Sequence, residues 1–173
     1  MDLHHHQLSE HIIKPMLQFM ALDVPGLATL LFATALQEAG LSEANQQQWG
    51  SNNGLGLYRI TECKHLALWD SYLISDAELA SRVRGLASQQ AFLRAPHQEL
   101  IGNLSYSSAM ALMVYRAAGA CLTSPALIER RPEHLAQLWS AHFDNGTGQA
   151  RSAASFMENW QQYTFLLETP LAA

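Results

Sequence analysis

Positive charge is scarce in this chain of 173 residues. Ten lysine and arginine residues stand against fifteen aspartate and glutamate residues, so the formal net charge is −5 at pH 7. A nucleic-acid groove needs concentrated cations, whereas the arginines of this chain are interspersed with acids. We therefore expect no nucleic-acid partner.

Cysteine is also rare. Cys63 and Cys121 show no C-x-x-C spacing and cannot form a metal cluster, so we predict two buried free thiols rather than a disulfide. The later histidines lack the H-E-x-x-H spacing of a zinc site, and the tract His4–His6 is interpreted as a solvated segment near the chain start. We expect no metal site and no cofactor.

Long apolar runs are missing as well. The apolar stretches are interrupted too often to cross a bilayer, so we expect no transmembrane segment. The start, MDLHHHQLSEHIIK, has neither the basic region nor the continuous apolar core of a secretory signal peptide. If the protein acts at a cell envelope, another component must deliver it there.

The apolar content that is present predicts one helical domain. Nearly half of the residues are hydrophobic (49%), which suits a single globular unit over 1–173, with 1–8 as a flexible N-terminal segment. Helical spacing and breaker residues predict helices at 9–20, 25–39, 65–74, 76–93, 98–118, 132–142 and 152–167. The fold class is mostly α.

One stretch departs from the helical pattern. QWGSNNGLGLYRI, at 48–60, contains an Asn-Asn-Gly turn signal followed by alternating apolar residues, which predicts one small β-hairpin. The helix before it, 25–39, is apolar nearly all round and should be the buried central helix of a bundle. Asp23 is its expected N-cap, and Gly40 its expected C-cap.

The central helix carries an acid near its C-terminal end. Within LLFATALQEAGL, at 30–41, Glu38 is the sole charged residue. Burial and the negative end of the helix dipole would both raise its pKa, as a general acid requires. The alternative is that Glu38 faces water at a fraying helix end, and the residues alone leave both open.

QEAGL at 37–41, followed by GLGLYRI at 54–60, resembles lytic transglycosylases and goose-type lysozymes, and most closely lysozyme-like proteins encoded by tailed phages. HIIKPML, LWDSYL, LIGNLSYSSAMALMVYR and LWSAHFDNGTG follow the order of that family. The resemblance implies an α+β lysozyme-like fold that cleaves peptidoglycan glycan strands, with Glu38 as the catalytic acid and base. It also implies a location in the virion or the host cytoplasm before delivery to the envelope.

The same resemblance implies a set of substrate-binding residues. Leu57, Tyr58 and Arg59 match the strand that lines the cleft, and Asn103 matches a polar helix position that faces sugar. Phe143 and Asp144 match a Tyr-Asn pair that closes the cleft. Trp49 is a further candidate for stacking on a sugar ring.

Three residues depart from the family pattern and keep other functions open. Ala39 stands where a serine usually follows the acid, Arg59 where glutamine is common, and Phe143 where a tyrosine hydroxyl would orient the acid. A non-catalytic virion or tail component, associating with itself or with other virion proteins, is therefore the alternative. A module that binds glycan without cutting it is a third hypothesis.

The sequence does not select a second carboxylate. A two-carboxylate glycosidase needs a partner for Glu38, and Glu62 and Asp70 are the nearest downstream candidates, with Glu43 and Asp144 behind them. In a transglycosylase one glutamate suffices, because the N-acetyl group of the substrate assists.

Overall fold

The computed structural model describes residues 7–39 and 54–168, the last four of these by their backbone alone. The predictions for His4–His6, Gly40, Glu43 and Trp49 lie outside these residues. Leu8, assigned above to the N-terminal segment, already begins a helix. The described chain is mostly helical, as predicted.

The helices follow one another with short connections. In chain order they are η1 (Leu8–Ile13), α2 (Lys14–Phe19), α3 (Leu27–Ala39), α4 (Glu62–Ala67), η3 (Leu68–Tyr72), η4 (Leu73–Ser75), α5 (Ala77–Leu86), α6 (Gln89–Arg94), η5 (Pro96–Gln98), α7 (Glu99–Gly102), α8 (Leu104–Ala117), α9 (Pro125–Ile128), α10 (Pro132–His142) and α11 (Ala153–Glu168). η1 and η3 are π-helical, and η4 and η5 are 3₁₀ turns.

Two predicted helices are each divided by a capping side chain. The predicted helix 76–93 starts after Asp76, which caps the backbone N–H of Leu79, but it ends at Leu86 and restarts after Ser88. The predicted helix 98–118 is interrupted at Asn103, whose extended backbone lets its side chain accept from the N–H of Tyr106. Short polar side chains that bond the backbone favour such starts over helix interiors.

The helix with Glu38 begins later than predicted. α3 starts at Leu27, not at Pro25, and Asp23 is therefore not its N-cap. The reason is Gly26, whose φ of +87° is incompatible with a right-handed helix. A Cβ at this position would also lie 1.9 Å from the carbonyl oxygen of Leu127, so the chain passes tightly against α9 here.

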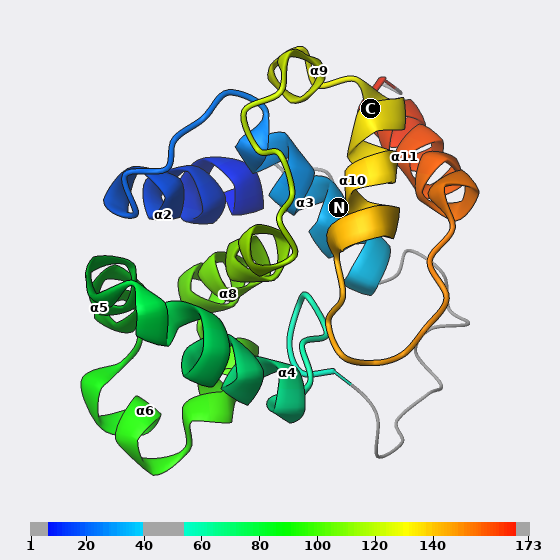
Figure 1. Ribbon diagram of the computed structural model, residues 1–173. Helices are drawn as coiled ribbons and strands as arrows, with labels where there is room; N and C mark the ends of the chain where they lie inside the picture. The colour runs from blue at the N-terminus through cyan, green and yellow to red at the C-terminus, as the bar shows by residue number, and fades with distance from the viewer. Residues whose placement is uncertain (1–6, 40–53, 169–173) are drawn as a thin grey trace, which may run out of the picture.

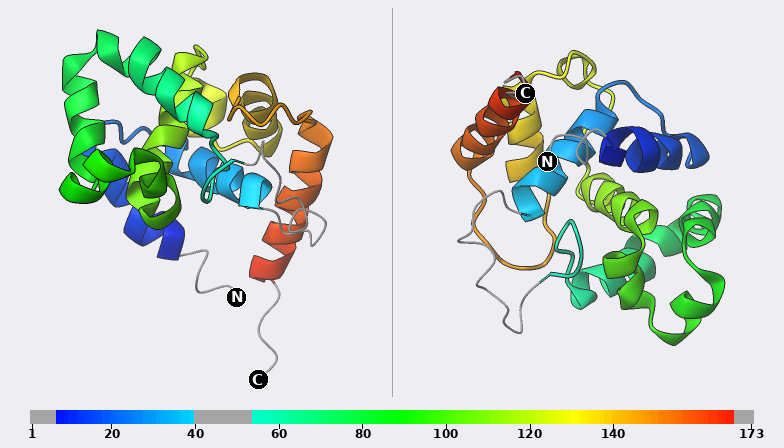
Figure 2. Two further views of the ribbon diagram at one scale, coloured as in Figure 1. Left: turned by 90° about the horizontal axis from the view of Figure 1, so that it is seen from below. Right: turned by 180° about the vertical axis from the view of Figure 1, so that it is seen from behind.

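The core is built around two helices. Every residue of α8 from Tyr106 to Tyr115 is buried, and α3 is buried along most of its length, as its composition predicts. In Figure 1, α8 lies in the middle of the molecule with α3 beside it, and α10 and α11 lie together on the far side of α3. Both views of Figure 2 keep α10 and α11 side by side.

The predicted hairpin is a tight loop in the described residues. Leu55 and Ile60 form one antiparallel bridge, with N···O distances of 2.9 and 3.2 Å, and neither side extends into a strand. The loop is pressed against α7, because a Cβ on Gly56 would lie 1.7 Å from the carbonyl oxygen of Leu100. This packing fixes the position of the loop against α7.

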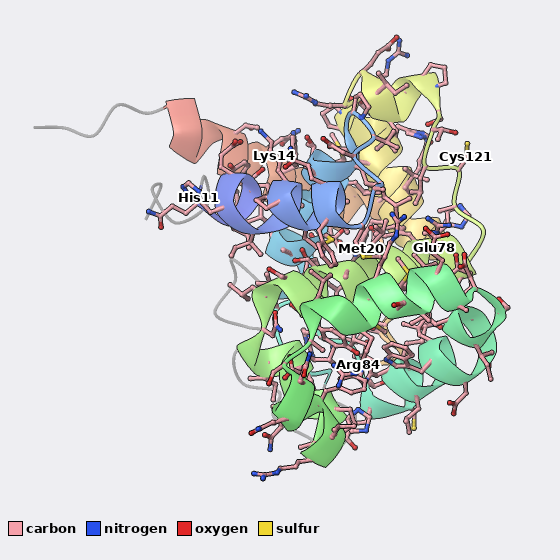
Figure 3. All side chains as sticks on the ribbon, turned by 90° about the vertical axis from the view of Figure 1, so that its left-hand side faces the viewer. His11, Lys14, Met20, Glu78, Arg84 and Cys121 are labelled. Carbon is pink, nitrogen blue, oxygen red and sulfur yellow. The ribbon has the colours of Figure 1, made fainter. Side chains whose placement is uncertain are left out.

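Both cysteines are free, but they are exposed rather than buried. Figure 3 shows Cys121 at the periphery, on the segment that follows α8. Cys63 lies on the outer face of α4. Among the described residues, no helix combines the length and apolarity needed to cross a bilayer.

Candidate functional site

Glu38 is the next-to-last residue of α3 and is 5% exposed. Of the two sequence interpretations, the buried one therefore holds. Its side chain lines a cavity of about 260 Å³. The lining residues come from α3, the 54–61 loop, α10, the α10–α11 connection and α11: Gln37, Glu38, Arg59, Trp139, Gln149, Ala150, Arg151, Ser155 and Asn159.

Two hydrogen-bond donors fix the carboxylate. The indole Nε1 of Trp139, on α10, donates to Oε1 of Glu38 at 3.0 Å. The amide Nδ2 of Asn145, on the loop after α10, donates to Oε2 at 2.8 Å. Each carboxylate oxygen therefore has a donor, and the orientation of the group is set by α10 and its following loop.

Asn145 joins the segments around the site. It is fully buried, and its Nδ2 also donates to the carbonyl oxygen of Tyr58 at 3.3 Å. Its Oδ1 accepts from Nη2 of Arg151 at 2.6 Å, and its backbone carbonyl accepts from the N–H of Thr61 at 2.9 Å. One side chain thus ties α3, the 54–61 loop and the α10–α11 connection, drawn in orange in Figure 1, to one another.

Two arginines share the cavity with Glu38. Nε of Arg151 lies 3.6 Å from Oε1 of Glu38, and the Arg151 side chain is 10% exposed. This buried Nε–H has no hydrogen-bond acceptor among the described residues. Arg59 reaches the cavity from a backbone with φ of +51°, and its Nη1 lies 3.4 Å from the side-chain oxygen of Gln149.

The pKa of Glu38 is raised above that of an ordinary carboxyl. Burial is the dominant cause, because it disfavours the charged form. Arg151, the Trp139 hydrogen bond, Arg59 and the Asn145 hydrogen bond act in the opposite direction, in that order of size, without reversing the shift. Glu38 is therefore a carboxyl that holds its proton to higher pH than one in water.

Two further contacts fix the end of α3 that carries Glu38. Thr34, one turn before Glu38, contacts the Tyr115 hydroxyl at 2.6 Å, and burial raises the pKa of that phenol. On α11, the amide of Asn159 donates to the side-chain oxygen of Gln37. These contacts hold the end of α3 against both α8 and α11.

The loop residues predicted to bind substrate fall in different places. Arg59 does line the Glu38 cavity. Tyr58 is 0% exposed, and its hydroxyl contacts Ser108 at 3.1 Å, so no face of its ring is left for a ligand. Leu57 packs partly buried against the hydrophobic core and does not line the cavity. The difference arises because the residues do not alternate along a strand here.

Other predicted positions lie apart from the cavity. Asn103 caps α8, donates to a carboxylate oxygen of Glu99 at 2.8 Å, and lines a different hollow. Phe143 is buried, and its ring centroid lies 5.1 Å from that of Tyr115. Asp144 forms an ion pair with Lys64 at 3.3 Å and a bond from the Gly146 N–H, and the latter is the main cause of its lowered pKa.

Glu38 is the one carboxylate among the described residues that line the cavity. Among the described candidates for a second carboxylate, Glu62 and Asp70 are exposed on α4 and η3, and neither they nor Asp144 line the cavity. Within residues 7–39 and 54–168, no three His, Cys, Asp or Glu side chains gather in a way that could hold a metal ion.

Three residues of the site were not identified from the sequence. Trp139 has the pattern of a core residue, which it also is. Asn145 directly follows Asp144, which was predicted to bind substrate, in a turn-rich segment. The segment was therefore recognised as part of the site, but Asn145 itself was not. Arg151 is an isolated arginine in a polar connection, where no local pattern marks it.

Comparisons with known proteins return no match to this chain, whether with protein-family models, curated proteins or solved structures.

Proposed function

We propose that this protein has a lysozyme-like fold and cleaves the glycan strands of peptidoglycan, with Glu38 as general acid and base. The observation that carries the proposal is a buried carboxyl of raised pKa that opens onto a cavity and has a donor on each oxygen. The order of motifs along the sequence supports the same assignment. By that resemblance the protein is of phage origin and is delivered to the envelope by other components.

In the proposed reaction Glu38 donates its proton to the glycosidic oxygen as the bond to the anomeric carbon breaks. The raised pKa keeps the proton available for this step. Trp139 and Asn145 then stabilise the carboxylate that is left, because each donates to one of its oxygens. The ionised Glu38 is then the base for the second half of the reaction.

The transglycosylase route fits this cavity better than the two-carboxylate route. Among the described lining residues, Glu38 has no carboxylate partner. In the single-glutamate route the N-acetyl group of the substrate assists departure of the leaving group. The Glu38 carboxylate then takes the proton of the sugar 6-hydroxyl, and a 1,6-anhydro product forms.

The test compares release of soluble muropeptides from purified sacculi by the native protein, Glu38→Gln and Glu99→Gln. Glu99 is a matched control because it is also 5% exposed and hydrogen-bonded, yet it lies outside the Glu38 cavity. We expect Glu38→Gln to lower the rate about 10²- to 10⁴-fold and Glu99→Gln to retain it. Anhydro products identify a transglycosylase, and reducing ends a hydrolase. No release by folded native protein refutes the glycosidase.

The second candidate is a non-catalytic virion or tail component with the same fold. Arg151, 3.6 Å from the Glu38 carboxylate, and Arg59 in the same cavity favour it, because both stabilise the ionised form that cannot donate a proton. Sedimentation equilibrium of the native protein, together with the sacculus assay, separates the two. Self-association without muropeptide release supports this candidate, and a monomer that releases muropeptides eliminates it.

A further inference from the structure

The charge of the Glu38 cavity is opposite in sign to that of the whole chain. The chain has a formal net charge of −5, yet the charged side chains among the described lining residues are two arginines and Glu38. The cavity therefore has a charge of about +1 when Glu38 is ionised and about +2 when it is protonated. A neutral sugar ring carries no negative charge that could pair with this excess of positive charge.

Both arginines occupy positions that carry a cost in free energy, Arg59 through its backbone and Arg151 through its burial. The cost of burying Arg151 is offset in part by its ion pair with Glu38 and by the rings of Trp139 and Phe143, whose centroids lie 5.7 and 5.8 Å from its guanidinium carbon. Arg59 occupies a left-handed backbone conformation that costs most residues about 1 kcal/mol or more and that glycine adopts freely. Arg151 is 10% exposed, with its Nη2 fixed by Asn145 and its Nε–H without an acceptor among the described residues. Two guanidinium groups thus line one cavity, and their placement costs part of the folding free energy.

We infer that the Glu38 cavity binds a carboxylate on the ligand, and that Arg59 supplies its main contact, with Arg151 behind it. This inference rests on the proposed function and narrows its substrate class to glycan with a free carboxylate beside the bond that is cut. Arg59 is the more accessible of the two, since it is partly exposed whereas Arg151 is nearly buried. Guanidinium and carboxylate form paired, charge-assisted hydrogen bonds.

Peptidoglycan offers this chemistry from two sources. One is the lactyl carboxylate of muramic acid, which is free where the stem peptide has been removed. The other is a carboxylate of the stem peptide itself. Three tetrasaccharide probes distinguish them: one with free lactyl carboxylates, one with the same groups converted to neutral amides, and one with stem peptides attached.

Binding of each probe is followed by tryptophan fluorescence, because Trp139 lines the cavity. We expect the native protein to bind a carboxylate probe about 5- to 10-fold more tightly than the amide probe at low salt, the difference that one partly exposed ion pair supplies. Arg59→Gln should reduce this preference to less than about twofold. Arg59→Lys should retain only part of it, because the positive charge remains but the paired hydrogen bonds of the guanidinium are lost.

Arg94→Gln is the matched control. Arg94 is exposed on α6, which Figure 1 places on the opposite side of the molecule from α11, and its loss removes the same charge from the chain. We expect it to leave the preference unchanged. If the peptide-bearing probe binds best and depends on Arg59, the stem peptide is the source of the carboxylate.

Equal binding of the amide and carboxylate probes overturns the inference, as does a preference that Arg59→Gln leaves intact or an absence of binding to all three probes. The result is independent of cleavage. A carboxylate preference in a protein that releases no muropeptides retains the inference and refutes the glycosidase. Muropeptide release without a carboxylate preference refutes the inference and supports the glycosidase.

Discussion

Glu38 is subject to opposing electrostatic influences, and Arg151 is the largest that favours its ionised form. Replacing Arg151 with glutamine removes that charge while keeping a side-chain donor for Asn145. We therefore expect Arg151→Gln to raise the pKa of Glu38 further, as followed by the carboxyl ¹³C chemical shift against pH. Arg59→Gln should raise it less, because Arg59 is the weaker influence. An unchanged pKa in both variants would show that the arginines do not act on Glu38.

The raised pKa also links Glu38 to stability. Because the folded protein holds this proton more tightly than the unfolded chain does, its stability falls as pH rises from the unfolded pKa of about 4.5 through the folded pKa. Glu38→Gln lacks this titration. We expect the native protein to lose stability relative to Glu38→Gln as pH rises above about 4.5, measured by urea unfolding. A pH-independent difference between the two proteins would contradict the raised pKa.

At the scale of elements, the 54–61 loop is held by a backbone approach that only glycine permits. A Cβ on Gly56 would meet the carbonyl oxygen of Leu100 at 1.7 Å, and the φ of Gly56 is +67°. We expect Gly56→Ala to lower the free energy of unfolding by about 3 kcal/mol or more. Gly102→Ala is the control, since a Cβ there would meet nothing within 4 Å and should change stability by less than about 1 kcal/mol.

The sequence predicted which segments are helical more reliably than where they end. Periodicity identified α3, α5, α10 and α11, and the predicted helix start at residue 76 coincides with the observed cap, Asp76. The divisions at Ser88 and Asn103 were missed because a capping residue inside an apolar pattern resembles an ordinary polar position. The late start of α3 depends on Gly26 packing against Leu127, a contact between residues far apart in the sequence.

The candidate site shows the same contrast between features that local sequence determines and contacts between distant residues. Glu38 could be found because it is the sole charged residue of an apolar segment and lies near a helix end, although the residues alone left its burial open. Arg151 could not, because it reaches Glu38 through a connection more than one hundred residues later in the chain. Tyr58 was assigned to the ligand because it matches the strand that lines the cleft in the resembled family, but the loop directs its ring into the core.

Across the whole molecule, a second buried polar network lies in the part built from α4, η3, η5 and α8. His65 is 1% exposed, and its Nδ1 lies 2.9 Å from Nδ1 of His97. Its Nε2 contacts the Tyr106 hydroxyl at 2.6 Å, and that hydroxyl also accepts from the indole N–H of Trp69 at 3.0 Å. The Nδ1···Nδ1 contact needs one of its two nitrogens to be an unprotonated acceptor, so the network holds four elements together only while His65 and His97 are not both protonated.

Burial, with a smaller contribution from the nearby His97, lowers the pKa of His65 from 6.5 to about 4. The unfolded chain therefore binds this proton more readily, and the contribution to stability is complete above pH 6.5 and is lost as pH falls towards 4.

We expect His65→Gln to remove an acid-induced loss of stability on the order of 3 kcal/mol from the pH profile of the native protein, measured by urea unfolding. His11→Gln, at an exposed position on η1 that Figure 3 labels, should leave that loss intact. An equally steep loss in His65→Gln would show that other groups unfold the protein in acid. Because Glu38 acts in the opposite direction over an overlapping range of pH, the two effects partly cancel in the native protein. The pH profiles of the two single variants should therefore differ more from each other than the profile of the native protein differs from that of the double variant Glu38→Gln, His65→Gln.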